Sequence, residues 1–478
     1  MLLSTLHSLI HSLSKSEKRF FTLLVTSEQK DFYRLYELLE SQPVVNEKQL
    51  NDAFGEKSLE PARKYLYRTL MKALRLYESE KNIEGQLMNL LQDARILHDK
   101  GFFNAAHEQL DKLKVLALQH EKFSYWLPAI RLELQLHSRS QFGDLNEQAL
   151  VEQQNTMLQV LEHEQNFVRH AYLFETLSCR YWQRGLTQNP AEVQRLNDLL
   201  LEEYQLLNSR HYESFEAQKL HLHFQSQYFL MTGAPESSLS VFYELIAFYD
   251  QHSALWKDAP IHYLYVLDGI LADLRWCEQF DQMPFFIQKL RDFTLQNNTL
   301  IELGNALTDS YQMQQYLGEH RFDEAFTLAE KAANTYLTNT MNSLPTALKI
   351  EINLLIARIY FHKKLYQSAL KLLNNRLNEG IVDAPDYWQW LYYMLRLMIQ
   401  YELGNFDYLE YELKNLGRRH KKTNAPVLFS EWLSLFLKLL TNHRLLHEPA
   451  NKALNPQNLR LRQWLPFEEW VKEKAATP

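Results

Sequence analysis

The segment Phe322-Asp323-Glu324-Ala325 and its near copy Tyr366-Gln367-Ser368-Ala369 carry the strongest information about the fold of this chain. In both segments an aromatic residue follows a turn, and an alanine comes three residues later. A third copy is Phe103-Asn104-Ala105-Ala106. A ring that wedges the turn and a small side chain one helical turn later allow two helix backbones to approach closely. Each copy therefore predicts a pair of antiparallel helices packed against each other.

The turns recur at a near-constant spacing along the chain. Glycines mark four of them, at Gly101, Gly185, Gly233 and Gly404, and apolar helical patterns break at four more places, near residues 143, 280, 320 and 364. Successive turns are 40 to 48 residues apart. A fixed period in this range is typical of stacked helix–turn–helix units, which bury their apolar faces only against their neighbours. We therefore expect an all-α chain.

The units resemble tetratricopeptide repeats, a family that places an aromatic residue after the inter-helix turn and an alanine three positions later. Ala332 and Ala357 match further positions of that pattern, and Leu13–Phe21 is similar to the opening of bacterial helical-repeat proteins of unassigned function. The period exceeds the 34 residues of the family by about 6–14, and the units near 143, 185 and 233 lack its signature. The resemblance implies a right-handed superhelix of stacked antiparallel helix pairs.

Charge and pattern divide the chain into three expected parts, which are an N-terminal helical cap (1–80), the repeat array (84–442) and a tail that packs on the array (443–478). The array is acidic, because residues 81–416 hold 28 Lys and Arg against 42 Asp and Glu, and the chain as a whole carries a net charge of −7. An acidic surface repels phosphates, so nucleic acid is an unlikely partner of the array. In the cap, a helix over Leu59–Glu78 is expected to start with Pro61 in its first turn. It carries a basic side at Lys64, Arg68, Lys72 and Arg75.

Several other features indicate what the chain lacks. With 46% apolar and 23% charged residues and only two cysteines, Cys179 and Cys277, it has the composition of a globular protein without a disulfide framework. The opening Met1–Leu13 lacks a basic start and a cleavage site, and no uncharged apolar run is long enough to cross a membrane. We therefore expect a cytoplasmic protein, and its oligomeric state stays open.

No motif for catalysis or cofactor binding is present. There is no glycine-rich phosphate loop and no zinc-protease helix motif. Two histidine pairs have the i,i+4 spacing of metal ligands, His7/His11 and His443/His447, but no third ligand accompanies them. We therefore expect no catalytic residue, no cofactor and no metal, and we expect that the protein is not an enzyme.

The resemblance also implies where a partner would bind. In tetratricopeptide-like arrays the first helix of each unit lines the concave face, through residues about eight and four positions before the turn aromatic. Carried over to this chain, these positions are Arg95, Asp99, Gln314, Arg358, His362, Met398 and Glu402. Their mixed polarity suits the recognition of a peptide.

Three functions are compatible with the sequence. The favoured one is a protein-interaction scaffold that binds a peptide or partner protein in the concave groove. The alternative is a regulatory protein with a nucleic-acid-binding N-terminal cap and a ligand-sensing array, which a basic patch on the folded cap would favour. The third is an enzyme with a site inside the superhelix, which a deep pocket with converging carboxylates and histidines would favour. A fold alone does not select among them.

Overall fold

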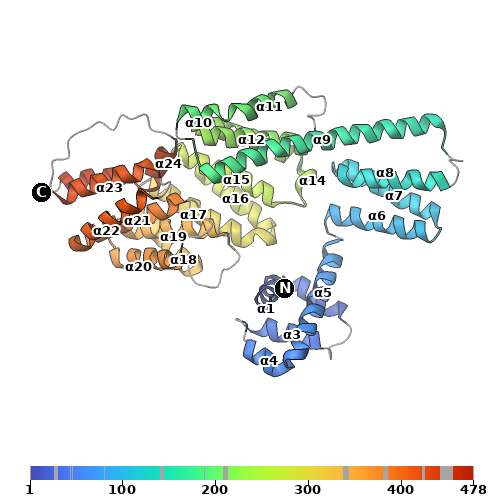
Figure 1. The fold of residues 1–478 in the computed structure, drawn as a ribbon, viewed down its shortest axis with the longest axis horizontal. Helices are drawn as coiled ribbons and strands as arrows, with labels where there is room; N and C mark the ends of the chain where they lie inside the picture. The colour runs from blue at the N-terminus through green and yellow to red at the C-terminus, as the bar shows by residue number, and fades with distance from the viewer. Residues whose placement is uncertain are drawn as a thin grey trace. The chain divides into compact units, whose positions relative to one another are not determined.

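All regular structure in the described part of the chain is helical. The computed structural model of the protein describes residues 2–25, 31–42, 45, 47–79, 81–139, 145–187, 189–207, 214–336, 344–380, 386–422, 426–441 and 456–476. Among these residues there are helices and no strand (Figure 1). This confirms the expected all-α class. No helix within these ranges combines the length and the apolar character that a membrane crossing requires.

The chain forms two compact units, residues 1–164 and residues 165–478. The first unit contains α1 (Leu3–Ser12), α2 (Lys15–Leu24), α3 (Asp31–Ser41), α4 (Glu47–Phe54), α5 (Glu56–Ser79), α6 (Ile83–Asp99), α7 (Phe103–Gln119), α8 (Phe123–Arg139) and the start of α9 (Glu147–Arg184). Two separate apolar clusters stabilise it, one within α1–α5 and one within α6–α9. The predicted boundaries of cap, array and tail stay a prediction.

The second unit contains the rest of α9 and the remaining helices. These are α10 (Pro190–Gln194), α11 (Asn197–Leu207), α12 (Phe215–Thr232), α13 (Pro235–Gln251), α14 (Ser253–Trp256), α15 (Ile261–Trp276), α16 (Met283–Gln296), the short 3₁₀ helix η1 (Asn298–Leu300), α17 (Ile301–Gly318), α18 (Phe322–Tyr336), α19 (Thr346–His362), α20 (Tyr366–Glu379), α21 (Asp386–Glu402), α22 (Phe406–His420), α23 (Val427–Leu440), α24 (Pro456–Trp464) and α25 (Phe467–Ala476). From α12 to α23 the helices pack in chain order, with α13 contacting both α14 and α15, and α23 also contacts α25.

The inter-helix turns lie where the sequence predicted them, and they share one backbone geometry. A residue in the left-handed region ends α6, α12, α15, α17, α19 and α21. In the same order, these residues are Gly101, Gly233, Glu278, His320, Lys364 and Gly404. In all six turns the next amide N–H donates to the carbonyl five residues back, at 2.8–3.0 Å. This Schellman geometry satisfies carbonyl groups that a helix end otherwise leaves unpaired. The turn expected near 143 lies outside the described residues.

One long helix departs from the expected succession of short pairs. The pattern predicted paired helices with short loops from residue 84 onward, but α9 runs unbroken over 38 residues. Its sequence contains no glycine and no proline, so nothing in it stops helix propagation. The boundary between the two compact units falls inside this helix, between Glu164 and Gln165.

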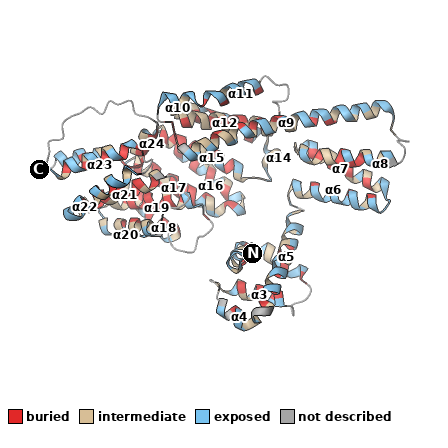
Figure 2. Ribbon diagram, in the orientation of Figure 1, coloured by how far each residue is buried: buried red, intermediate tan, exposed pale blue. Residues whose placement is uncertain are grey.

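Burial follows the pattern expected of stacked helix pairs. Ala325 and Ala369, the alanines of the repeated motif, are fully buried at the helix pairs α17–α18 and α19–α20. In the second unit, α15, α17, α19 and α21 each hold more buried positions than any other helix, whereas α18, α20 and α22 keep an exposed outer side (Figure 2). A single apolar cluster extends from Phe215 to Val471 and includes residues of α24 and α25.

The N-terminal helices follow the sequence except at one boundary. Ser14 and Glu17 form the expected capping box at the start of α2. The helix predicted to begin at Leu59 instead begins at Glu56, directly after the left-handed Gly55. Pro61 is therefore inside α5 rather than in its first turn. The predicted basic side of this helix is exposed at all four positions, Lys64, Arg68, Lys72 and Arg75.

Candidate binding channel

The C-terminal helices α24 and α25 pack across several earlier helices of the second unit. Gln463, near the end of α24, donates from Nε2 to the carbonyl oxygen of Trp276 at 2.8 Å, at the end of α15. On α25, Trp470 packs edge-on against Tyr401 of α21, with 5.3 Å between ring centroids, and lies 5.6 Å from Phe436 of α23. One short segment thus contacts α15, α21 and α23 at once.

Arg358 of α19 binds the end of α24. Its Nη1 donates to the carbonyl oxygens of Gln463 at 3.0 Å and of Trp464 at 2.9 Å. Carbonyls in the last turn of a helix have no intrahelical partner and carry the negative end of the helix dipole, so a guanidinium there stabilises the helix end. Arg358 is one of the seven predicted groove residues. The structure places it against a helix of the same chain.

Glu402, another predicted groove residue, binds α25. Its carboxylate accepts a hydrogen bond from the indole nitrogen of Trp470 at 2.8 Å and pairs with Lys474 at 2.8 Å. The carboxylate is largely buried, with 13% of the side chain exposed. Arg358 and Glu402 therefore face the same C-terminal segment, although they come from different helices.

A channel with a volume of 620 Å³ remains beside α24. Its walls come from the turn after α12, the end of α15, α17, α19 and the segment of α24–α25. His362 lines it together with Arg358 and Gln314, so three of the predicted groove residues meet here. Arg275, Trp276 and Trp464 complete the walls near α24. The volume is in the range of sites that hold a few side chains of a ligand.

Two arginines with buried guanidinium groups, Arg275 and Arg358, line the channel, together with Arg462 and three glutamates (Glu236, Glu278 and Glu469). The guanidinium of Arg275 lies 3.9 Å from the ring centroid of Trp464, a cation–π contact. Burial lowers the pKa of Arg275 to about 9, against the opposing effect of Glu351, and burial lowers the pKa of Arg358 to about 10. Nη2 of Arg275 and Nε of Arg358 are buried and have no hydrogen-bond partner in the described part of the chain. Such donors are costly to leave unpaired.

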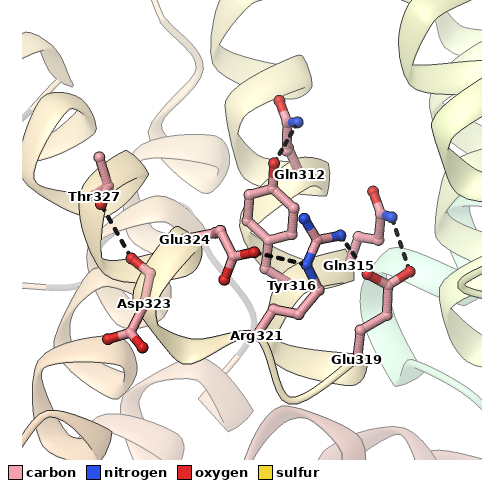
Figure 3. A network of polar contacts seen from close by, with 8 residues as sticks. All are labelled: Gln312, Gln315, Tyr316, Glu319, Arg321, Asp323, Glu324 and Thr327. Carbon is pink, nitrogen blue, oxygen red and sulfur yellow. Dashed lines mark hydrogen bonds and ion pairs between the residues drawn. The ribbon is translucent and has the colours of Figure 1, made fainter.

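The turn between α17 and α18, at one edge of the channel, is held by a polar network (Figure 3). Arg321 donates to Glu319 at 2.9 Å and to Glu324 at 3.1 Å, and its guanidinium lies 4.5 Å from the ring centroid of Tyr316. These contacts join the two helices on both sides of the turn. They fix the backbone at His320, which has a positive φ of 59°.

Two other predicted groove residues are buried within the helix packing. Gln314 is 4% exposed, and its Nε2 donates to Ser310 and Glu351, both at 3.0 Å. Met398 is 2% exposed within the apolar cluster. Gln314 reaches the channel, whereas Met398 contributes to the core.

Arg95 and Asp99, the remaining predicted groove residues, belong to the first unit. Both are exposed on α6, and the Asp99 carboxylate lies 3.0 Å from Nδ1 of His98. No described segment covers them in the way that α24–α25 cover Arg358 and Glu402.

The histidines singled out by spacing have structural contacts. Nε2 of His7 lies 2.7 Å from the carbonyl oxygen of Gln42, and Nε2 of His11 lies 2.9 Å from that of Leu39. The pair thus bonds carbonyl groups at the end of α3. His443 and His447 lie outside the described residues.

Sequence reasoning missed the residues that α24 and α15 bring to the channel. Arg275 on α15 lies 188 positions before Gln463 and 189 positions before Trp464, which are both on α24. No local sequence pattern connects residues so far apart. One signal was present, because Trp464, Phe467 and Trp470 form an aromatic series in an otherwise polar tail.

Comparison of the chain with protein-family models, with curated proteins and with solved structures found no match in any of the three.

Proposed function

We propose that this protein is an interaction scaffold that binds a segment of a partner protein in the channel beside α24, without catalysing a reaction. The observation that carries the proposal is that two arginines with buried, unpaired donors, Arg275 (Nη2) and Arg358 (Nε), line a channel of 620 Å³. A carboxylate of a bound peptide would pair with both guanidinium groups and remove the cost of leaving them unpaired. The proposal includes a tetratricopeptide-like right-handed superhelix and a cytoplasmic location.

The contacts of α24 and α25 support this proposal, because they are an example of how the earlier helices hold a helical segment. Arg358 binds backbone carbonyls and Glu402 binds an indole and an ammonium group. Backbone carbonyls, aromatic rings and charges are the groups that any helical partner segment offers.

The channel also contains histidines and carboxylates, which an enzyme would need. Phe322 stacks on His362 with 4.7 Å between ring centroids, and His320 lies 5.9 Å from the same ring. In the described part of the chain, neither histidine is hydrogen-bonded to a carboxylate or a hydroxyl group. A nucleophile and base within hydrogen-bond reach would be the mark of covalent or acid–base catalysis. We therefore favour binding.

The experiment is cross-linking of the tagged full-length chain in a cell extract, followed by mass spectrometry. A partner is expected to cross-link near the channel and to be lost from an Arg275→Gln variant and from an Arg358→Ala, His362→Ala double variant. Arg95→Ala, in the exposed position on α6, is the matched control and should retain the partner. Equal capture by all variants would overturn the proposal.

A second function has one specific observation in its favour, the exposed basic side of α5. Tyr65 and Tyr67 are also exposed on this helix, at 51% and 37%. Basic groups next to exposed rings are suited to binding a single-stranded nucleic acid. A gel-shift assay with the full chain tests this alternative: an Arg68→Ala, Lys72→Ala variant should lose binding, and absence of a shift with the unmodified chain would exclude it.

A further inference from the structure

Two histidines and a glutamate converge on the face between α7 and α8 in the first unit. His107 comes from α7, and Glu133 and His137 come from α8, one helical turn apart. One ligand atom of each residue lies within 4.8 Å of the others. The two imidazole rings are 4.8 Å apart between centroids. Glu133 is 6% exposed.

The packing of the two helices fixes this arrangement. The turn between α7 and α8 has the Schellman geometry at Glu121, where the N–H of Lys122 donates to the carbonyl oxygen of Ala117 at 2.7 Å. Lys114 of α7 reaches across and donates to Glu133 at 2.6 Å. Gln153 of α9 donates to the other oxygen of Glu133 at 3.1 Å. Each oxygen of the carboxylate therefore accepts a hydrogen bond that fixes its position.

The chemistry of the three groups matches that of a transition-metal site. Two imidazoles and one carboxylate are a known ligand set of zinc sites with an open position. An imidazole must be neutral to bind a metal.

The local charge also favours a cation. Lys114 pairs with Asp111 at 2.8 Å as well as with Glu133, so one ammonium group faces two carboxylates. The cluster of Asp111, Lys114 and Glu133 thus carries a net charge of about −1, which attracts a divalent ion.

We propose that His107, Glu133 and His137 bind a divalent transition-metal ion, for which Zn²⁺ fits best, with the fourth position open to water. The ligand atoms of a tetrahedral zinc site lie about 3.4 Å apart, given bonds of about 2.0–2.2 Å. Small side-chain rotations close the distance from 4.8 Å. Glu133 supplies the oxygen that Gln153 now holds, and Lys114 keeps its bond to Asp111.

The chain contains its own control for this proposal. His7 and His11 also lie close together, with ring centroids 4.2 Å apart. Among the described residues, however, no carboxylate or thiolate joins them as a third ligand. These two histidines are expected not to bind the metal.

The experiment is a titration of the metal-free full-length chain with Co²⁺, whose visible absorption reports coordination, followed by competition with Zn²⁺. One Co²⁺ per chain is expected, and Zn²⁺ should displace it. His107→Asn and His137→Gln should each weaken binding about 100-fold or more, whereas a His7→Asn, His11→Asn variant should bind like the unmodified chain. Lys114→Met should strengthen binding, because it removes a positive charge next to the site.

Circular-dichroism spectra show whether each variant is folded. An absorption spectrum without tetrahedral Co²⁺ bands for the unmodified chain would overturn the proposal. Equal binding by the folded His107→Asn and His137→Gln variants would overturn it as well, because the ion would then be held elsewhere. A failure of this site leaves the proposed channel of the second unit untouched.

Discussion

On α6, Arg95 and Asp99 are exposed, whereas Arg358 and Glu402, at the matching places on α19 and α21, are covered by the C-terminal helices. The repeat pattern assigns all four residues to the same kind of position. The difference comes from α24–α25, a segment far away in the sequence, which packs on Arg358 and Glu402. A position in a helical repeat thus becomes an open surface or an internal contact according to what covers it.

The largest expected effect comes from removing the aromatic anchor of this cover. Trp470 is 7% exposed, and Trp470→Ala should weaken the packing of α25 by about 3–5 kcal/mol, because it removes a large buried ring. Hydrogen exchange of residues 456–476, followed peptide by peptide, measures the effect. Trp182→Ala is the matched control, since Trp182 is 67% exposed on α9. Equal exchange in both variants would show that α25 is not anchored by its tryptophan.

The next effect tests the helix pairs themselves. Ala325→Leu and Ala369→Leu should each cost about 1–3 kcal/mol, because both alanines are fully buried where two helices pack and the added methyl groups have no space. Ala475→Leu, on an exposed part of α25, should change little. Thermal melts measure all three. Unchanged melting of both buried variants would contradict the alignment of the repeated motif.

The helix pairs were predictable from the sequence, because their signals are local. The aromatic residue and alanine around Phe322 lie within one turn of each other, and Gly404 marks a helix end by itself. Even turns without glycine, such as the one at His320, are visible as breaks in the apolar pattern. The continuous helix α9 was not predicted. The regular spacing of the turns favoured two shorter helices in this region, although the sequence of α9 contains no glycine or proline that would end a helix.

The candidate sites were only partly predictable, because they depend on contacts between distant segments. Arg358 and His362 were placed on a groove, but their neighbour Trp464 is about a hundred residues away. The spacing of Glu133 and His137 on one helix was visible, whereas His107 on the preceding helix was not connected to them. Sequence patterns predict which residues share one face of a helix. They do not predict which distant segment packs against that face, because tertiary packing determines it.

A smaller effect compares the two arginines directly. Arg358→Ala should weaken the attachment of α24 by about 1–3 kcal/mol, because two carbonyl groups at its end lose their donor. Arg95→Ala, at the exposed matching position, should stay within about 0.5 kcal/mol of the unmodified chain. Faster hydrogen exchange in residues 456–464 of the Arg358 variant alone is the expected result. Equal hydrogen-exchange rates of residues 456–464 in both variants would show that Arg358 does not stabilise the attachment of α24.

The smallest expected effect concerns the turns that follow α6 and α21. Gly101 lies two residues after Asp99, and Gly404 lies two residues after Glu402. Their φ values are 82° and 74°, and a Cβ added at either glycine would have no neighbouring atom within 4 Å. Gly101→Ala and Gly404→Ala should therefore each cost about 1 kcal/mol, from the strain of a left-handed alanine alone. Lys364→Gly, at a left-handed residue with a φ of 60°, should gain a similar amount. Segment-resolved hydrogen exchange compares the three variants. If Gly404→Ala lowers the stability much more than Gly101→Ala does, the packing of α24–α25 also depends on the turn after α21. The two units would then differ in the role of their turns as well as in the burial of the compared residues.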